Sequence, residues 1–229
     1  MEHARILLFD IGSTLIEGPD SGPAQRFADL LGIEKRAVRD LLFRTELSGP
    51  EDLAARLARQ FAAGAARALE VSASLWRAQI EEAYVLPGAR EAIARLKQAG
   101  IRRGYLSNIW PPFYQRFALE FPEEAASGDC FLSFRTGLMK PDLEAFRAAL
   151  DRCGVEPSAA VMVGDTYKAD IEPALRLGMK AIWILHRPHK ERRDLARVLN
   201  GEARRPHLTL TSIAELLPEH AIMSPSCES

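Results

Sequence analysis

The stretch "LLFDIGSTLIEG", which runs from Leu7 to Gly18, joins a short apolar run to a polar turn. The apolar run ends abruptly at Asp10, and Gly12, Ser13 and Thr14 follow it. An acidic residue at the tip of a buried strand, followed by small and hydroxyl residues, indicates a turn that holds phosphate. Two different protein classes use such a turn, and the rest of the chain distinguishes between them.

The composition indicates a globular protein without an overall attraction for nucleic acid. The chain has 229 residues, of which 47% are hydrophobic, and this is enough to bury a proper core in one large domain, or in one domain with an insertion. A net charge of −1 gives no field that attracts nucleic acid or an anionic membrane. The basic run from His186 to Arg193 is typical of a solvated loop or helix face. We therefore predict neither a nucleic-acid nor a membrane partner.

The cysteines and the apolar segments indicate a cytoplasmic protein. Cys130, Cys153 and Cys227 are odd in number and widely spaced, which fits neither a disulfide framework nor a CxxC metal site. No apolar stretch approaches the length of a signal sequence or a membrane span. We expect reduced thiols, and either a monomer or a homodimer.

Strand-like and helix-like segments alternate along most of the chain. The predicted strands are Ile6–Phe9, Ile101–Leu106, Ala159–Val163, Ala181–Leu185 and a shorter Leu208–Leu210. The predicted helices are Ala89–Ala99, Asp142–Cys153, Lys168–Leu177 and one that begins at Ser212, where Glu215 completes a capping box. This alternation is typical of a Rossmann-like α/β fold with a parallel sheet. We expect the tail after Pro218 to be frayed.

Residues 17–86 interrupt the alternation, because we find no convincing strand there. The predicted helices of this segment are Gln25–Leu31, Lys35–Leu47, Glu51–Leu69 and Ala73–Tyr84. The sequence therefore predicts an α/β core formed by residues 1–16 and 87–229, with an all-helical module inserted at residues 17–86.

Polar residues follow the predicted strands where ligands bind in an open parallel sheet, at the carboxyl ends. These residues are Asp10 and Thr14 after the first strand, Ser107 and Asn108 after the second, and Asp165 and Asp170 after the third. The basic residue Lys140, within "GLMKPDLEAF", lies between strands and is expected at the same edge. Carboxylates that face one another repel unless a cation lies between them, and Mg²⁺ is the natural choice for oxygen ligands. An ammonium, a hydroxyl and an amide complete a site for a phosphate beside a metal.

The order of these motifs resembles that of the haloacid dehalogenase superfamily over most of the chain. The matches are Asp10 to Thr14 for the first motif, Ser107 in "GYLSN" for the second, Lys140 before Pro141 for the third, and Gly164, Asp165 and Asp170 for the fourth, GDxxxxD. The resemblance implies a Mg²⁺-dependent hydrolase that acts on a small phosphorylated metabolite. It also implies that the inserted helices form a cap, which closes over the site and selects the substrate.

The resemblance also implies a role for each site residue. Asp10 is expected to attack phosphorus and form an aspartyl-phosphate, and Ser107 and Lys140 to bind the transferring phosphoryl oxygens. Mg²⁺ is expected to be held by Asp10, the Gly12 carbonyl and Asp165, with Asp170 orienting that metal site. Thr14 is expected to support the loop. Asn108 is expected to support the phosphate-binding residues.

Gly12 departs from the pattern of the family's phosphatases, which carry a second Asp at this position as the general acid and base. Such a group contributes on the order of 10²–10⁴ in rate. Three alternatives follow. The enzyme is slow or restricted to esters with good leaving groups, or a neighbour such as Glu17 or Asp20 replaces the missing acid. In the third alternative, the protein binds a phosphorylated ligand or a protein partner without turnover. Family members that cleave carbon–halogen or carbon–phosphorus bonds also lack this Asp, but the second route uses a cap lysine, and the module offers only Lys35.

The first turn also fits the DxGxT phosphate loop of actin-like sugar kinases, and Gly12 matches that pattern literally. That fold requires two duplicated domains with antiparallel hairpins directly after the loop, and this chain is too short and becomes helical instead. A kinase loop also leaves Lys140 and Asp165 without a role. The aromatic residues of "NIWPPFYQRF" either line the cap interface or pack in the core.

Overall fold

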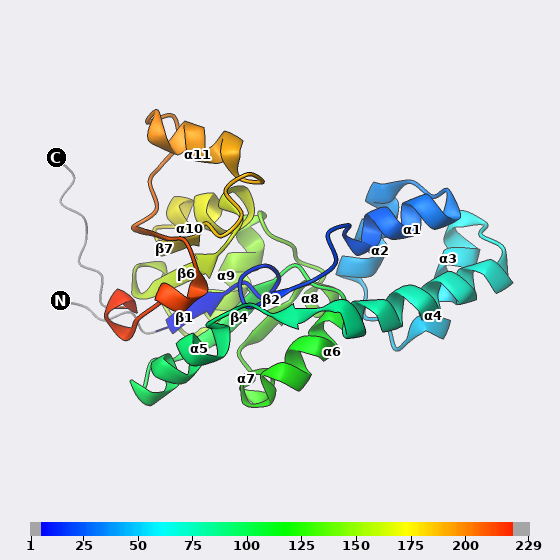
Figure 1. The fold of residues 1–229 in the computed structure, drawn as a ribbon, viewed down its shortest axis with the longest axis horizontal. Coiled ribbons are helices and arrows are strands. Elements are labelled where there is room, and N and C mark those ends of the chain that lie inside the picture. Colours follow the sequence, from blue (N-terminus) through cyan, green and yellow to red (C-terminus); the bar gives the residue numbers. More distant parts are fainter. Residues whose placement is uncertain (1–5, 222–229) are drawn as a thin grey trace.

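The structure, a computed structural model, describes residues 6–221 and has a six-stranded parallel sheet at its centre (Figure 1). The strands lie in the order β5-β4-β1-β6-β7-β8. Their bounds are β1 Ile6–Phe9, β4 Arg103–Ser107, β5 Cys130–Leu132, β6 Ala160–Gly164, β7 Lys180–Ile184 and β8 Leu208–Leu210. Every pair of neighbouring strands is parallel, so the predicted Rossmann-like α/β fold is confirmed.

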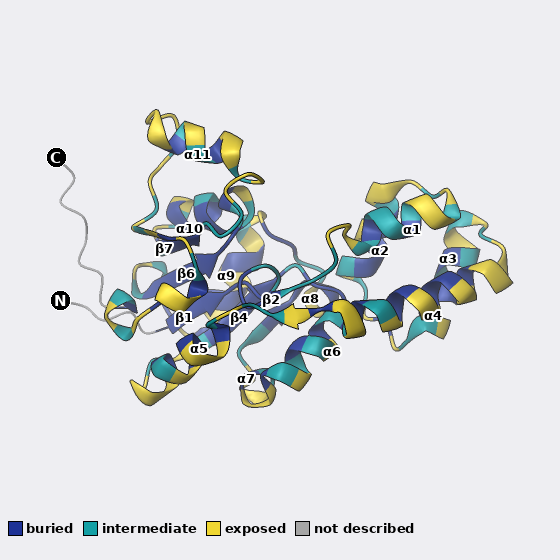
Figure 2. Cartoon of the chain, in the orientation of Figure 1, coloured by how far each residue is buried: buried dark blue, intermediate teal, exposed yellow. Residues whose placement is uncertain are grey.

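The strands are apolar on both sides because each side of the sheet has its own core. Leu7 and Phe9 face one core, whereas Ile6 and Leu8 face the other, as the two-residue period of a strand requires. The first face is covered by α5 Ala89–Gln98, α6 Pro111–Glu120 and α7 Pro122–Ala126. The second is covered by α9 Leu143–Cys153, α10 Glu172–Arg176 and α11 Arg192–Leu199. Figure 2 shows the buried strands between helices whose outer sides are exposed.

Four helices form a separate lobe beside the sheet, with a core of their own (Figure 1). They are α1 Pro23–Leu31, α2 Lys35–Arg44, α3 Pro50–Phe61 and α4 Ala65–Glu82. The chain enters and leaves the lobe through a two-stranded antiparallel ribbon, formed by β2 Ile16–Glu17 and β3 Tyr84–Val85. The predicted helical cap is therefore present as an insertion in the sheet domain.

The aromatic stretch after β4 packs at the junction of the lobe and the sheet domain. Trp110 precedes α6, yet its buried ring belongs to the core of the lobe. Its ring centroid lies 6.1 Å from that of Phe27 and 5.7 Å from that of Trp76, both edge to face. Of the two alternatives left open by the sequence, both describe Trp110 in part, because it lies at the junction and packs in the core of the lobe.

The predicted helix over residues 51–69 is wrong, as is the expectation of no strand in residues 17–86. The helix stops at Phe61 because Ala62 adopts a left-handed conformation with φ of 53°, and α4 starts only after Gly64. Helix α4 then runs without a break through Ala73, where a separate helix was predicted. The strands β2 and β3 escape sequence analysis because each has two residues. The strand β5 was also not predicted.

Two further predicted helices differ from the structure. Residues Tyr167–Ile171 form a π-helical turn before α10, where a continuous α-helix was expected. Ser212 accepts a hydrogen bond from the Ala214 N–H, but only a 3₁₀ turn, Ile213–Glu215, follows. The Glu215 carboxylate accepts from the Thr211 N–H instead of that of Ser212, so the predicted capping box does not form.

The remaining short elements are α8 Ser133–Thr136 and the 3₁₀ turns Pro157–Ala159 and Pro218–Ala221. The tail that was expected to fray therefore begins with an ordered turn, and its later part, with Cys227, lies outside the described residues. Between residues 6 and 221, none of the helices has both the length and the apolar character required to cross a bilayer.

Candidate active site

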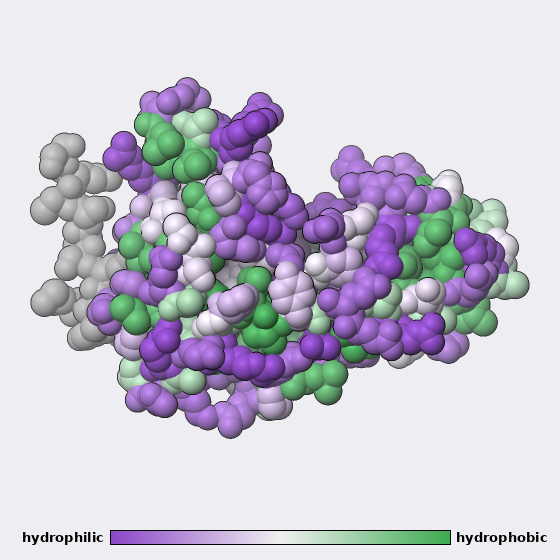
Figure 3. Space-filling view, in the orientation of Figure 1, coloured by the Kyte–Doolittle hydropathy of each residue, from purple (hydrophilic) through white to green (hydrophobic). Residues whose placement is uncertain are grey.

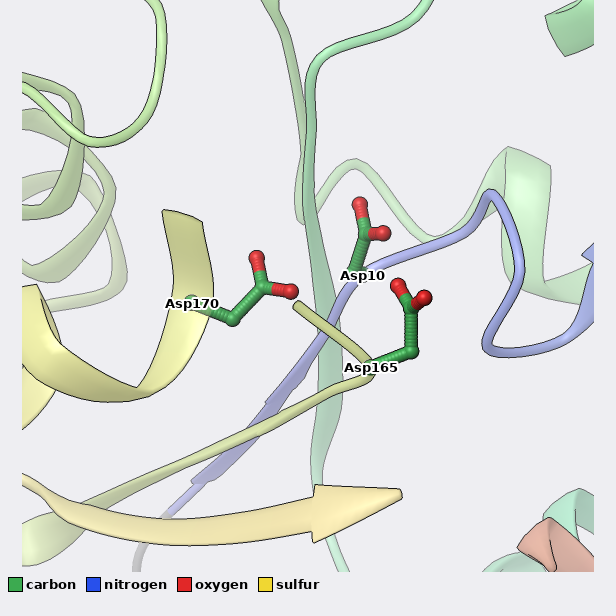
Figure 4. A group of neighbouring side chains, drawn as sticks. All are labelled: Asp10, Asp165 and Asp170. Atoms are coloured by element: carbon green, nitrogen blue, oxygen red, sulfur yellow. The ribbon is translucent and has the colours of Figure 1, made fainter. Parts of the chain in front are cut away.

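Three carboxylates from distant parts of the sequence converge at the carboxyl end of the sheet. Asp10 follows β1, Asp165 follows β6, and Asp170 lies in the π-helical turn. One oxygen of each lies within 4.8 Å of the others, and all three residues are buried. Figure 4 shows the three side chains gathered around one point. The predicted convergence of these residues is therefore observed.

Lys140 lies between two of these carboxylates. Its Nζ donates to Asp10 Oδ1 at 2.8 Å and to Asp170 Oδ1 at 2.5 Å, and the residue is only 3% exposed. Burial by itself lowers the pKa of an ammonium, but the negative charges of the two carboxylates outweigh burial and raise the pKa of Lys140. The side chain is therefore a cation fixed directly beside Asp10.

The ammonium of Lys140 alone does not balance the negative charge of the three carboxylates. Burial and the nearby Asp170 and Asp10 raise the pKa of Asp165 well above its usual range, against the effect of Arg187. Burial also raises the pKa of Asp170 to about 6, although Lys140 lowers it. Three hard oxygen donors with excess negative charge are a donor set that suits Mg²⁺. The residues present therefore fit the metal that the motifs imply.

The fourth motif owes its glycine to the packing of Asp170. A Cβ on Gly164 would lie 2.5 Å from Asp170 Cγ, so a side chain at position 164 would displace the carboxylate. The Thr166 N–H donates to Asp170 Oδ2 at 3.0 Å, and the Trp183 indole N–H donates to the Asp165 carbonyl at 2.8 Å. These contacts fix both ends of the segment that carries the two carboxylates.

Asn108 holds the main chain of Lys140 in place. Its Nδ2 donates to the Lys140 carbonyl at 2.7 Å, and its Oδ1 accepts from the Lys140 N–H at 2.9 Å. Ser107 and Thr14 are buried, and neither hydroxyl has a hydrogen-bond partner among residues 6–221. Asn108, unlike Ser107 and Thr14, also lines the cavity described next. Burial of an unpaired hydroxyl is costly, and the described residues supply a partner for neither hydroxyl.

A cavity of about 330 Å³ lies between the sheet domain and the helical lobe. Asp10, Asp165, Asp170 and Lys140 line it from the sheet domain, and Phe43 from the lobe. The space-filling view shows the surface hollowed between the two parts (Figure 3). This volume is that of a small-molecule site.

Gly12 lies on the wall of this cavity opposite an aromatic ring. Its φ does not fall in the left-handed region, so the backbone conformation does not require glycine. A Cβ at this position would lie 3.2 Å from Phe113 Cε1, which is tighter than an ordinary contact. The place of the usual second aspartate is therefore partly taken by Phe113.

The basic run of residues 186–193 was expected to be solvated, and this is wrong for its first two residues. Arg187 donates from Nη2 to Asp165 Oδ2 at 2.6 Å and from Nη1 to Glu17 Oε1 at 3.2 Å. His186 Nε2 lies 3.3 Å from Glu17 Oε2. Because these residues follow β7, the rule that located the other site residues could have located Arg187 as well.

Glu17, considered above as a substitute acid, is held as a carboxylate. Burial raises the pKa of Glu17, but the contacts with His186, Arg187 and Ser13 together lower it below the ordinary value. A group in this state is a poor proton donor near neutral pH. Asp20 also lines the cavity, and it is exposed.

Comparisons with known proteins show the family of the chain. The family model for haloacid dehalogenase-like hydrolases matches residues 4–178. The chain belongs to this family. A glyceraldehyde 3-phosphate phosphatase of Pyrococcus furiosus is 31% identical over 106 residues, which cover 46% of this chain and 44% of that protein. A ribulose-1,5-bisphosphate 5-phosphatase of Halopiger xanaduensis is 27% identical over 201 residues, 78% of this chain and 84% of that protein.

The match to the glyceraldehyde 3-phosphate phosphatase spans less than half the length of that protein. Among solved structures, a hydrolase of the family from Deinococcus radiodurans with bound phosphate and sodium has a TM-score of 0.61 at 20% identity. That comparison covers 99% of this chain and all of the other. A family member from Bacillus subtilis bound to magnesium has a TM-score of 0.59 at 18% identity and covers 95% and 98% of the two chains. These structures share the fold.

Proposed function

We propose that the protein is a Mg²⁺-dependent phosphatase that hydrolyses a small phosphorylated metabolite through an aspartyl-phosphate on Asp10. The observation that carries the proposal is the position of Lys140, whose ammonium bridges the proposed nucleophile and Asp170 within a cluster of three buried carboxylates. Phosphatase relatives and the size of the cavity support the same substrate class.

The first chemical step uses Asp10. One of its carboxylate oxygens attacks phosphorus, a phosphorus–oxygen bond forms to Asp10, and the bond to the leaving-group oxygen breaks. Water then attacks the phosphorus of the aspartyl-phosphate, which releases inorganic phosphate and restores the carboxylate. Lys140 lies against Asp10 and offers N–H donors to the phosphoryl oxygens, where negative charge must be stabilised in the transition state.

Asp165, Asp170 and the Gly12 carbonyl are the groups that we assign to the metal together with Asp10. When bound, Mg²⁺ supplies positive charge for the phosphoryl oxygens and relieves the repulsion among the carboxylates. Ser107 offers its unpaired hydroxyl to the same phosphate, and Asn108 keeps Lys140 in place. Thr14, which is buried behind the turn, supports the loop.

The leaving oxygen has no aspartate at position 12 to protonate it. Glu17 is held as a carboxylate by Arg187 and His186, so the proton must come from water or from the exposed Asp20. We therefore assign the enzyme slow turnover of alkyl phosphate esters and faster turnover of esters whose leaving groups are stable anions. Residues 17–86 act as the cap that excludes water from this step.

The test is phosphate release from a panel of phosphate esters with and without Mg²⁺. The wild-type protein should show slow metal-dependent turnover, and Asp10→Asn should abolish it because the amide is not a nucleophile. Equal inactivity of the two proteins over the whole panel would refute the proposal.

The second candidate function is a family member that binds a phosphorylated ligand or a protein partner without turnover. Gly12, with Phe113 against it, is the observation that favours this reading. Calorimetric binding together with the phosphate-release assay discriminates the two functions. A protein of the second kind would bind phosphate esters in the presence of Mg²⁺ and release no phosphate from any of them.

A further inference from the structure

Gln79 is a polar residue of the cap that lines the cavity without a role in the chemistry described above. It lies on α4 at the end of a buried stripe that includes Val71, Leu75 and Trp76. The side chain is only 4% exposed. Apolar residues occupy most such positions, so a glutamine here requires an explanation.

The contact with Trp110 fixes which way the amide group points. The Trp110 indole N–H donates to Gln79 Oε1 at 2.9 Å. An indole nitrogen can only donate, so the oxygen must face Trp110 and the NH₂ group must face away from it. The contact with Trp110 therefore sets the orientation of the amide, and the two N–H donors of Nε2 point away from Trp110.

These donors have no partner in the described part of the chain. Nε2 is shielded from solvent and makes no hydrogen bond to any of residues 6–221. A buried donor without a partner costs free energy comparable with a lost hydrogen bond, and such groups are rare in folded proteins. A donor of this kind at a ligand cavity indicates that a ligand supplies the missing acceptor.

Gly18 packs closely against this donor. A Cβ on Gly18 would lie 3.1 Å from Gln79 Nε2, so any other residue would occupy the space next to the amide. Gly18 lines the same cavity, and its φ lies outside the left-handed region, so the backbone itself does not require glycine. The absence of a side chain is thus explained by the close contact between the Gly18 backbone and the amide group of Gln79.

We propose that Gln79 determines substrate specificity by donating a hydrogen bond from Nε2 to an oxygen of the leaving group. This inference rests on the proposed phosphatase function and deepens it. The phosphoryl group lies at Asp10 in the sheet domain, whereas Gln79 belongs to the cap, so the amide contacts the other part of the ester. The substrate class is a phosphate ester of a small hydroxylated or carbonyl-bearing alcohol that fits a cavity of about 330 Å³.

The test measures binding by calorimetry in an Asp10→Asn background with Mg²⁺, so that turnover plays no part. The probes are glycerol phosphate, phenyl phosphate, whose leaving group has no further acceptor, and inorganic phosphate. Gln79→Met should weaken glycerol phosphate about tenfold, the effect of one hydrogen bond, and leave the other two within about twofold. Gly18→Ala should give the same selective loss, because its methyl group obstructs the donor. Gln98→Met, an exposed substitution of the same kind, should change nothing.

The outcomes separate this inference from the proposed function. If all three probes weaken together, the amide contacts the phosphoryl group or supports the fold, and the inference is overturned. It is equally overturned if neither variant changes the affinity for glycerol phosphate. Inactivity of the wild-type protein would refute the phosphatase proposal alone, since the binding measurements do not depend on turnover. Unfolding curves establish that each variant is folded.

Discussion

Restoring the aspartate that the family's phosphatases carry, by Gly12→Asp, should convert this protein into a faster phosphatase once Phe113 is made smaller. The backbone at position 12 accepts an L-residue, but the new Cβ would lie 3.2 Å from Phe113 Cε1. Such overpacking costs about 1–3 kcal/mol of stability, because the Phe113 ring or the new side chain must shift to relieve the contact. Phe113→Leu removes the ring from this contact.

The size of the gain follows from what a general acid contributes, on the order of 10²–10⁴ in rate, or about 3–5 kcal/mol of barrier. We expect the lower end, about 10²-fold in kcat for the double variant, because the present site is packed around a glycine and an aromatic ring at this position. The gain should be greatest for glycerol phosphate, whose alkoxide must be protonated as it leaves. It should be small for nitrophenyl phosphate, whose leaving group is a stable anion.

The assay compares steady-state phosphate release with Mg²⁺ by the wild-type protein, Phe113→Leu, the double variant, and a matched double variant with Gly12→Asn. The asparagine has the size of aspartate without its acidity, so it should give no increase. If the aspartate variant is folded and hydrolyses glycerol phosphate no faster than the asparagine variant, the reasoning about position 12 is wrong. An equal gain on both esters would also contradict a role in protonation.

Three further substitutions test the electrostatics and the backbone. Lys140→Met should abolish phosphate release and lower the free energy of unfolding by about 3–5 kcal/mol, because it leaves buried carboxylates without their cation. Burial and Lys180 lower the pKa of His207 below its ordinary value of 6.5, so its contribution to stability is complete above pH 6.5 and is lost as the pH falls. His207→Gln should therefore reduce the loss of unfolding free energy between pH 7.5 and about 5.5. Ala62→Gly should stabilise the protein by about 0.5–1 kcal/mol, because alanine is strained at a φ of 53°.

Each of these substitutions has a matched control. Urea unfolding measures the stability of every variant, and phosphate release with Mg²⁺ measures the activity of Lys140→Met. Lys168→Met removes an exposed lysine and should cost less than about 0.5 kcal/mol. His189→Gln changes an exposed histidine and should leave the pH dependence as it is. Ala66→Gly, within helix α4, should destabilise, in contrast to the substitution at Ala62. A variant that behaves like its control would contradict the corresponding argument.

The strands and the acidic cluster could be predicted because both depend on short-range patterns and one topological rule. A strand covered on both faces is apolar throughout, which makes Ile6–Phe9 and the strand after Ala159 visible in the sequence. Parallel strands end at the same edge, so Asp10 and Asp165 had to approach each other. The convergence of Lys140 on the same point was predicted from the motif order that this chain shares with its family.

The residues that sequence analysis missed depend on packing between distant elements. Gln79 lies four residues after Leu75 on a buried helical stripe, and this position was its one signal, but the sequence cannot show which residues α4 meets. Arg187 was hidden in a charged run whose average character is that of a solvated loop. The break after Phe61 depends on a single left-handed alanine, a conformation that helix propensity argues against.

The two-residue strands β2 and β3 have a consequence for how the molecule could be rebuilt. Because Ile16 pairs with Val85 and Glu17 with Tyr84, the chain departs from the sheet domain and returns to it at neighbouring points. A tight turn joining these two strands could therefore replace the helical lobe without altering the register of the parallel sheet. Foreign modules of any length whose ends lie equally close together could be transplanted at the same junction.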